Sequence, residues 1–323
     1  MLEDLAEIGC CNTAVEWFCS YLSNRKQKVK DDSGRTEWKD FNKGVPLGGC
    51  LSSLLFNIFV RKLPEECGAR TVQFADDVTE SSSDVNVTSI LKHLESSFVR
   101  TKKYCDSREL SINTSKTQLI IFKSPNRKIP DNLEISVDGC TIKPSLTVKL
   151  LGITLDHHLS FNNHMQSVSK KCHGIIGVLA RASPFLSRDL LRLAYIALVR
   201  SHLEYASVIF STASNAQLKK LDTIQKISSR VVCSAPRDAH AAPLLQALKL
   251  DTLESRRIRH IVSLVQSVIS GNCHPALHHL FLVTPYGSVT NDEKSRIRIG
   301  KRRFSVFARE IYSSQMLTLS TKQ

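Results

Sequence analysis

The sequence predicts an α+β fold in the first half of the chain and an all-helical fold in the second. Up to about residue 156, short segments rich in strand-forming residues alternate with amphipathic helices. Beyond that point, leucine, isoleucine and valine recur at helical spacing. A chain of 323 residues is long enough to bury a sizeable core. We therefore expect an α+β region over residues 1–156, a helical region over 157–290 and a basic tail over 291–323.

The expected elements of the first half follow from hydrophobic period and turn chemistry. Residues 12–22 place apolar side chains on one helical face, and Asn12 is a suitable cap. An almost wholly apolar run from Cys50 to Leu63 predicts a buried helix. The remaining expected elements are a hairpin with a basic arm around Asp32-Ser33-Gly34, a hairpin with a turn at Asp76-Asp77, a helix over 85–105, and strands at 117–122, 133–137 and 148–155.

Three apolar stripes predict helices in the second half, at 190–198, 218–231 and 258–269. The last of these helices has a clear start, because Asp251 and Glu254 match a capping box. Gly271 is a plausible stop for the same helix. The segment from Asn291 to Glu310 is rich in basic residues, which is typical of a charged tail.

Charge and cysteine usage narrow the class of protein. Forty-four Lys and Arg against thirty Asp and Glu give a formal charge of +14, which favours a polyanionic partner, first of all nucleic acid. The ten cysteines include no Cys-x-x-Cys pair, so they indicate reduced thiols of an intracellular protein. The start of the chain has neither a secretory signal nor a membrane-spanning run. The group Cys273, His274, His278 and His279 is interrupted by Pro275, and we do not expect zinc there.

Two motifs indicate phosphoryl-transfer chemistry. The loop from Gly44 to Gly49 contains Pro46 and leads into an apolar helix, so its backbone is shaped for close approach to a ligand. Asp76 and Asp77 follow an apolar strand, and Mg²⁺ is typically held by a few carboxylates together with the phosphates of the substrate. Taken alone, the acidic pair could be a solvent-facing turn and the loop a simple helix start. The order and spacing of the two motifs in the chain favour a functional role over these two alternatives.

With these motifs in place, the chain resembles the reverse transcriptase domain of non-LTR retrotransposons of the jockey-like or a related type. The segment from Ala14 to Val29 resembles the part of that family that follows its first catalytic Asp. Gly44 to Phe56 is similar to the template and nucleotide loop, and Phe74-Ala75-Asp76-Asp77 to the catalytic hairpin. Further similar segments are Leu110 to Thr117, Leu150 to Asp156 and Leu203-Glu204-Tyr205-Ala206.

The resemblance implies a polymerase palm, which is an antiparallel sheet with packed helices, followed by a thumb-like helical region. It also implies an RNA template, a DNA primer, a deoxynucleoside triphosphate and Mg²⁺ or Mn²⁺ as the cofactor. The implied catalytic residues are Asp76, Asp77 and Lys116, of which Asp76 and Asp77 are the metal ligands. The other implied sites are a nucleotide and template loop at Gly44, Pro46, Leu47, Gly48 and Gly49, a primer grip at Leu151 and Gly152, and nucleic-acid contacts at Arg25, Lys26 and Lys28.

Departures from the family pattern leave the activity open. Leu47 stands where a Gln is usual, which removes an amide donor and acceptor. The family's upstream Asp and its fingers region have no counterpart here, so we expect a domain truncated at its N-terminus whose isolated polymerase activity is weak or absent. The alternative is a non-catalytic nucleic-acid-binding remnant of a mobile element. A third, more distant, alternative is a helical scaffold whose basic face meets another protein.

Overall fold

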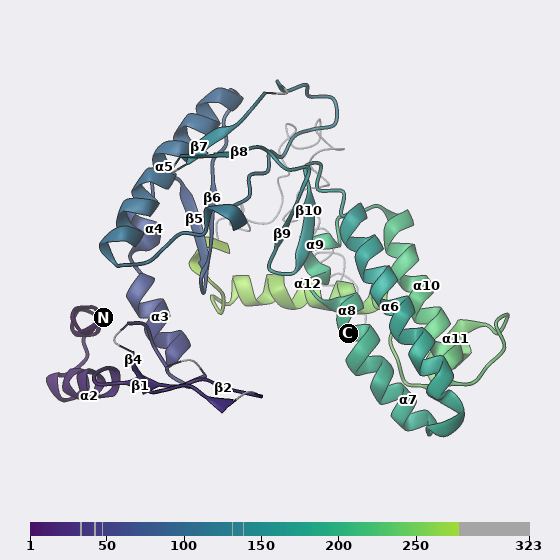
Figure 1. Cartoon of the computed structure of the whole chain (residues 1–323). Coiled ribbons are helices and arrows are strands. Elements are labelled where there is room, and N and C mark those ends of the chain that lie inside the picture. The colour runs from purple at the N-terminus through teal and green to yellow at the C-terminus, as the bar shows by residue number, and fades with distance from the viewer. Residues whose placement is uncertain (33, 42, 47, 131, 138, 278–323) are drawn as a thin grey trace. The chain divides into compact units, whose positions relative to one another are not determined.

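The computed structural model describes residues 1–277 except residues 33, 42, 47, 131 and 138. Within these residues the chain forms two compact units (Figure 1). The first unit contains Met1–Leu119 and Lys128–Pro144, and the second contains Ile120–Arg127 and continues from Ser145. Helices and short antiparallel strands together confirm the predicted α+β class. The expected boundary at residue 156 stays a prediction, and the boundary at 290 and the basic tail over 291–323 lie outside the described residues.

Strands of the described residues form separate antiparallel pairs, and each strand has one partner. The registers are short and local, and each pair joins strands that lie close together in the sequence. The pairs are β1 (Lys26–Gln27) with β4 (Lys39–Asp40), β2 (Lys30–Asp31) with β3 (Gly34–Arg35), β5 (Arg70–Phe74) with β6 (Asp77–Ser81), β7 (Ile135–Val137) with β8 (Cys140–Ile142), and β9 (Thr147–Leu150) with β10 (Ile153–Asp156).

The first unit is organised around its longest helix, α5, whose start is capped by Asn86. Leu91 on this helix packs with Ile135 and Val137 of β7 in a small apolar core. The helices of this unit are α1 (Leu2–Glu7), α2 (Asn12–Leu22), α3 (Ser52–Val60), α4 (Leu63–Glu66), α5 (Val87–Ser107) and the 3₁₀ turn η1 (Thr114–Lys116).

A second set of contacts fixes the β5–β6 hairpin on α5. The buried hydroxyl of Ser97 accepts hydrogen bonds from the backbone N–H groups of Gly68 at 3.1 Å and Ala69 at 2.9 Å, directly before β5. The hydroxyl of Thr101, one helical turn later, donates to the Glu80 carboxylate on β6. Both strands are therefore tied to one rigid helix, and the tip of the hairpin is held at a defined distance from it.

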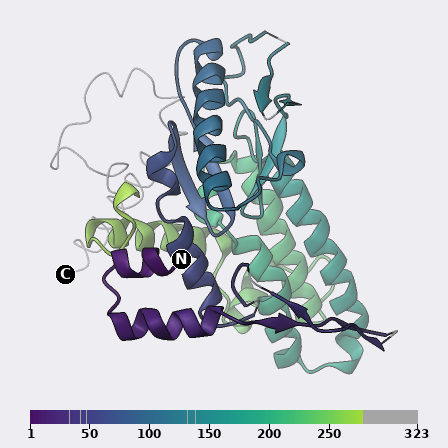
Figure 2. The same ribbon diagram turned by 60° about the vertical axis from the view of Figure 1, so that its left-hand side comes forward.

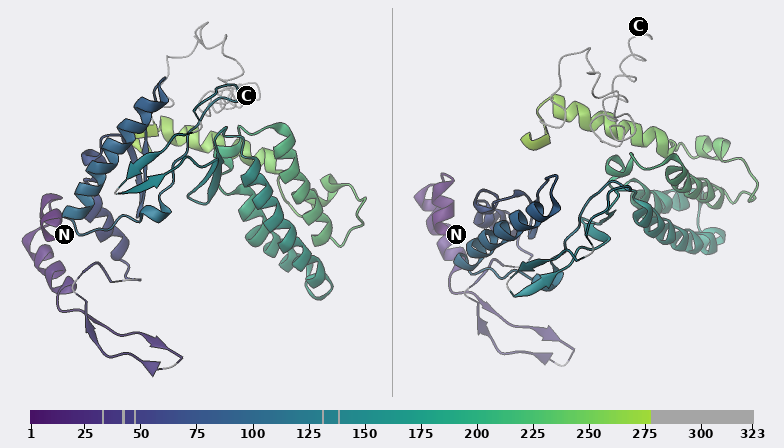
Figure 3. Two further views of the ribbon diagram at one scale, coloured as in Figure 1. Left: turned by 45° about the horizontal axis from the view of Figure 1, so that its top comes forward. Right: turned by 90° about the horizontal axis from the view of Figure 1, so that it is seen from above.

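Residues 25–41 form a long hairpin that projects from the first unit, here called the arm (Figures 2 and 3). Its two pieces, β1–β4 and β2–β3, have registers that differ by one residue. Lys26 faces Asp40, whereas Lys30 faces Arg35. Three residues on the returning strand therefore oppose two on the outgoing strand, which is a β-bulge. The bulge spans residues 36–38.

The second unit is a helical bundle with the β9–β10 hairpin packed on it. Helices α6 and α10 lie side by side, and their inner faces bury Cys172, Ile176, Leu221 and Ile224 (Figures 1 and 2). Burial raises the pKa of the Cys172 thiol to about 11. The elements are α6 (Asn162–Ala182), η2 (Ser183–Phe185), α7 (Arg188–Ala194), the π-helical η3 (Tyr195–Arg200), α8 (Ser201–Glu204), α9 (Ser207–Phe210), α10 (Asn215–Val232), α11 (Ala241–Ala247) and α12 (Leu253–Ile269).

Helix predictions were mostly confirmed, with corrections at the starts. Asn12 is the first residue of α2, and Cys11 occupies the cap position. Thr252 caps α12 by accepting from the Ser255 N–H, so the expected Asp251 cap is wrong. Asp251 instead forms an ion pair with Arg259 at 2.9 Å. Gly271 follows the last helix with φ 72°, as expected for a stop.

Strand predictions needed larger corrections. Residues 117–122 form no strand, and only Leu119 makes an isolated bridge, with Pro144. The predicted strand at 148–155 folds back on itself as β9 and β10, because Leu151 and Gly152 adopt positive φ and reverse the chain. Helix α6, which the apolar stripes did not predict, fills the interval after β10. No helix in the described part of the chain is long and apolar enough to cross a membrane.

One buried carboxylate joins three parts of the first unit. Asp4 on α1 is 3% exposed. It accepts from Arg61, after α3, at 2.8 Å and from Arg108, after α5, at 2.7 Å. Burial raises the pKa of Asp4, but the hydrogen bonds from Arg108, the amino-terminal ammonium group of Met1 and Arg61 outweigh burial and hold the pKa well below its usual range. The ionised carboxylate is therefore part of the folded state.

We expect Asp4→Asn to lower the free energy of unfolding of the first unit by about 2 kcal/mol, because two arginines lose their charged acceptor. Since the pKa of Asp4 is lower in the folded state, its stabilisation is present above about pH 4, the unfolded value, and is lost as the pH falls below it. Urea unfolding at pH 7 and pH 3 measures both effects. Glu3→Gln, which removes an exposed carboxylate on the same helix, should change neither. An equal loss in both variants would contradict this role of Asp4.

Candidate functional site

The acidic pair lies at the tip of the β5–β6 hairpin, one residue out of the predicted register. Ala75 and Asp76 form the turn, whereas Asp77 is the first residue of β6 and pairs with Phe74. The predicted turn at Asp76-Asp77 is therefore corrected to Ala75-Asp76. Both carboxylates are exposed to solvent. Because they belong to a turn and a strand respectively, they differ in backbone surroundings and in freedom to reorient.

The turn is held in an unusual backbone conformation. Ala75 has φ 52°, in the left-handed region that costs a residue with a Cβ about 1 kcal/mol. The Gln73 side-chain amide donates to the Ala75 carbonyl at 3.0 Å and so supports the turn from the strand. A two-residue hairpin turn needs positive φ to match the twist of its strands. This requirement brings Asp76 to the extreme end of the hairpin.

The donor set of this turn suits a magnesium ion only in part. Carboxylate oxygens are the ligands that Mg²⁺ prefers, and few of them suffice when substrate phosphates complete the shell. Among the described residues, no group of three or more His, Cys, Asp or Glu side chains is placed to hold a metal. Asp76 and Asp77 thus fit a metal that arrives with, or is shared by, a phosphate-bearing ligand.

The glycine loop is closed onto the helices that flank it. The Ser52 hydroxyl, at the start of α3, donates to the Pro46 carbonyl, and the Gly49 N–H bonds the same carbonyl at 3.3 Å. A Cβ at Gly49 would lie 2.8 Å from Ser52 Oγ and 3.1 Å from the Tyr21 hydroxyl, so a larger residue there would displace the Ser52 side chain. Gly48 has open space around it. Leu47 lies outside the described residues.

Arg25 connects the glycine loop to the arm. Its guanidinium donates to the Gly44 carbonyl at 2.6 Å and to the Leu22 carbonyl at 3.0 Å, and it stacks over the Phe41 ring at 4.9 Å. Sequence reasoning placed Arg25 among nucleic-acid contacts, but its Nε and one terminal nitrogen bond within the protein, and the other terminal nitrogen is buried without a hydrogen-bond partner among the described residues. The other two expected contacts are exposed: Lys26 pairs with Asp40 at 3.8 Å, and Lys28 lies over the Trp38 ring.

Lys116 ends the 3₁₀ turn η1 and is exposed. The Asn113 side chain accepts from the Lys116 N–H at 3.2 Å and from the Ser115 hydroxyl at 2.6 Å, so the backbone of this loop is fixed locally. The Lys116 amine forms no ion pair with a described residue. No hydrogen bond or ion pair of the described residues joins Asp76 or Asp77 to Lys116 or to the glycine loop, although all lie in the first unit.

The expected primer-grip residues form the turn between β9 and β10 in the second unit. Leu151 and Gly152 have φ 45° and 83° and connect the paired residues Leu150 and Ile153. The Tyr205 hydroxyl donates to the Leu151 carbonyl at 2.6 Å. A Cβ at Gly152 would lie 3.3 Å from the Tyr205 ring. The tyrosine therefore covers the turn and requires the glycine.

Tyr205 is itself held by a charged corner. The preceding residue, Glu204, accepts from both Nε and a terminal nitrogen of Arg256 on α12, and lies 3.7 Å from Arg200. Ser207, just after the corner, bonds His260 on the same helix at 3.1 Å. The sequence resemblance included Tyr205 but gave it no physical role. A hydroxyl reaching a carbonyl 54 positions away leaves no local signal in a sequence.

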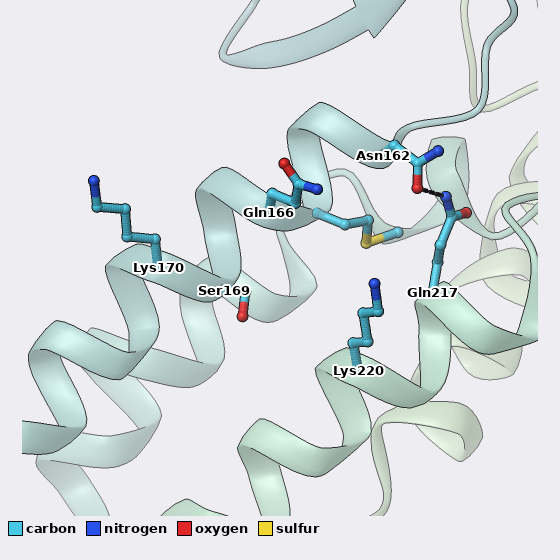
Figure 4. A pocket seen from close by; sticks show the side chains of 7 residues that line it. Asn162, Gln166, Ser169, Lys170, Gln217 and Lys220 are labelled. Atoms are coloured by element: carbon cyan, nitrogen blue, oxygen red, sulfur yellow. Dashed lines mark hydrogen bonds between the residues drawn. The ribbon is translucent and has the colours of Figure 1, made fainter.

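A small polar cavity lies between α6 and α10 (Figure 4). Its volume is about 300 Å³. The Gln217 side-chain amide donates to the Asn162 side-chain oxygen at one end, and Lys170 and Lys220 rise from the two helices.

The sequence analysis considered Cys273, His274, His278 and His279 as zinc ligands and did not expect zinc there. The Cys273 thiol donates to the His274 carbonyl at 3.7 Å, and His278 and His279 lie outside the described residues.

The acidic hairpin turn and the glycine loop lie in one unit, and both fall within a stretch of the chain that matches a known family. Residues 1–155 match the family described as reverse transcriptase (RNA-dependent DNA polymerase). The chain is 24% identical over 253 residues to the probable RNA-directed DNA polymerase from transposon BS of Drosophila melanogaster, covering 75% of this chain and 28% of that protein.

Two jockey polymerases are similar to a comparable extent. The RNA-directed DNA polymerase from mobile element jockey of Drosophila funebris is 26% identical, covering 67% of this chain and 25% of that protein. The jockey polymerase of Drosophila melanogaster is 25% identical, covering 72% and 26%. The chain thus spans about a quarter of the length of these relatives. Residues 1–155 are a reverse transcriptase domain of the kind found in non-LTR retrotransposons.

We expect Tyr205→Phe to loosen the β9–β10 turn without unfolding the second unit. Loss of the hydrogen bond to the Leu151 carbonyl should cost about 1 kcal/mol, which corresponds to about fivefold faster amide exchange in residues 147–156. Hydrogen-exchange mass spectrometry measures this change. The matched variant Tyr21→Phe removes a hydroxyl that makes no hydrogen bond with a described residue, and should leave these peptides unchanged. Unchanged exchange in Tyr205→Phe would show that the bond does not hold the turn.

Proposed function

We propose that this chain contributes the catalytic hairpin of an RNA-directed DNA polymerase, which extends a DNA primer on an RNA template. The observation that carries the proposal is the exposed Asp76 at the tip of β5–β6, within the residues that match the reverse transcriptase family. A carboxylate at the end of a rigid hairpin can reach a bound substrate without first being desolvated by its own protein. The relatives' names describe the same activity for those proteins.

In this proposal Asp76 and Asp77 hold Mg²⁺ or Mn²⁺, with unequal parts. When bound, such ions stabilise the attacking and leaving oxygens of an in-line phosphoryl displacement. Asp76, in the turn, faces the ligand directly. Asp77 is anchored in β6 by its pairing with Phe74, and consecutive strand residues point to opposite faces. Asp77 therefore orients the hairpin or completes an outer shell.

Other residues of the proposed site bind and position the substrates. In the glycine loop, Gly44, Pro46 and Gly49 hold the backbone in shape, and the open space at Gly48 allows close contact with the nucleotide or template. The exposed Lys116 amine stabilises or protonates the departing pyrophosphate. The turn of Leu151 and Gly152, covered by Tyr205, positions the primer strand. The palm assignment of the first unit and the thumb-like assignment of the helical bundle belong to the same proposal.

A second candidate function is nucleic-acid binding without catalysis. The formal charge of +14 and the exposed cations of the arm favour it, because neutralising phosphates releases counterions whether or not a metal is present. The two functions differ at Asp76. Metal-linked chemistry requires its carboxylate, whereas electrostatic binding does not, and removing one negative charge should slightly strengthen such binding.

We expect Asp76→Asn to weaken Mn²⁺ binding by about tenfold, because a turn carboxylate is replaced by a neutral amide. A Mn²⁺ titration of the full chain, followed by the EPR signal of the free ion, measures this directly and does not require polymerase activity. Primer extension on an RNA template, where present, should be lost in the same variant.

The matched control is Glu16→Gln, which removes an exposed carboxylate from α2 in the same unit. Its Mn²⁺ affinity should equal that of the parent chain. Equal affinities in both variants, together with unchanged RNA binding and a steep salt dependence, would contradict the metal role of Asp76 and favour the second function.

A further inference from the structure

The arm carries an exposed aromatic side chain with a lysine over its ring. Trp38 is 59% exposed, and the Lys28 Nζ lies 4.5 Å from its ring centroid. A two-stranded ribbon has no interior in which to bury this ring. Trp38 directly follows Glu37 in the bulge, where the register slips by one residue. Bulges re-aim the side chains beside them. The ring is therefore presented to solvent by the fold of the arm itself.

The register of the arm also places like charges opposite each other. Lys30 pairs across the strands with Arg35, and neither side chain forms an ion pair with an acidic side chain that the structure describes. Like charges at directly opposed positions destabilise an antiparallel pair. A bound polyanion would remove this repulsion, whereas a neutral or cationic partner would not. The arm is thus electrostatically complementary to phosphate.

Acidic residues of the arm limit how much its positive charge alone can contribute to binding a polyanion. Asp40 is engaged by Lys26, and Asp32 and Glu37 are exposed on the same arm. The arm is therefore not a uniformly basic surface, and its charge would not by itself give strong binding. Several cations of the arm, among them Lys28, Lys30 and Arg35, form no ion pair with an acidic side chain that the structure describes.

We propose that the arm binds an unpaired nucleic-acid strand, with Trp38 stacked on a base and Lys28, Lys30 and Arg35 against the phosphates. Only an unpaired base offers its whole face for stacking, and an aromatic platform combined with a charged groove is how proteins bind single strands without sequence preference. The inference rests on the proposed function only for the class of ligand. It adds Trp38, Lys30 and Arg35 to the expected contacts and removes Arg25, which is committed to Gly44 and Leu22.

The two tryptophans of the chain allow a matched experiment. Trp17 is 54% exposed, close to the value for Trp38, but it belongs to α2 and not to the arm, and it stacks on Tyr21. In the Trp17→Phe variant of the full chain, Trp38 is the single tryptophan. We expect oligo(U) RNA and oligo(dT) DNA of twenty nucleotides to quench its fluorescence, whereas a blunt duplex of equal length should bind without quenching.

Affinities for the same oligonucleotides are then compared among variants by fluorescence anisotropy of a labelled strand. Trp38→Ala should weaken binding about tenfold, within the range measured for loss of one stacked base. Trp38→Phe should retain most of the affinity, and Trp17→Ala should match the parent chain. Lys28→Ala or Arg35→Ala should each reduce the slope of log affinity against log salt by about one. These results would support the proposal.

Three results would overturn it: equal affinity in Trp38→Ala and Trp17→Ala, equal quenching by duplex and single strand, or no affinity for single strands. Asp76→Asn should leave the Trp38 quenching unchanged, because that residue is not on the arm. If Asp76→Asn binds Mn²⁺ as well as the parent chain does, and single strands still quench Trp38, the proposed function alone is rejected. If single strands do not quench Trp38, and Asp76→Asn binds Mn²⁺ more weakly than the parent chain, the arm proposal alone is rejected.

Discussion

Positive backbone φ at two-residue turns is the constraint on which the candidate site depends. Ala75 precedes Asp76 with φ 52°, and Leu151 and Gly152 reverse the chain between β9 and β10 with φ 45° and 83°. Such turns match the twist of the strands that they join, but they strain any residue with a Cβ by about 1 kcal/mol. Both motifs therefore lie where the fold accepts local strain, and strained backbone tends to accumulate at functional sites.

Each strained turn is supported by a side chain from a rigid element. Gln73 bonds the Ala75 carbonyl from within β5, and β5–β6 is in turn fixed to α5 through Ser97. Tyr205 bonds the Leu151 carbonyl from a corner that Glu204 fixes to α12. One neutral hydrogen bond contributes about as much as the turn strain costs. The support is local within each unit, so each turn keeps its shape independently of the other.

The sequence predicted elements whose signal is local and missed those set by tertiary contacts. The helical period of residues 12–22 gave α2 with its limits, and Gly271 marked the end of α12. The acidic turn was placed one residue late, because Ala75 carries no composition signal for positive φ. The strand expected at 117–122 was lost because its residues divide between the two units after Leu119. Tyr205 escaped a physical interpretation because its partner is remote in the sequence.

Arg25 explains why the arm and the glycine loop should be considered together. Its guanidinium bonds the carbonyl of Gly44 at the start of the loop and that of Leu22 at the end of α2, and Phe41 at the base of the arm stacks beneath it. The base of the arm and the first residue of the loop are therefore cross-linked by charge-assisted hydrogen bonds, which are stronger than neutral ones. A displacement of the base of the arm would therefore be transmitted to Gly44 through Arg25. Arg25, which its sequence context predicted as a nucleic-acid contact, thus has a structural task, whereas the proposed contacts with a strand lie further along the arm, at Trp38 and Lys28.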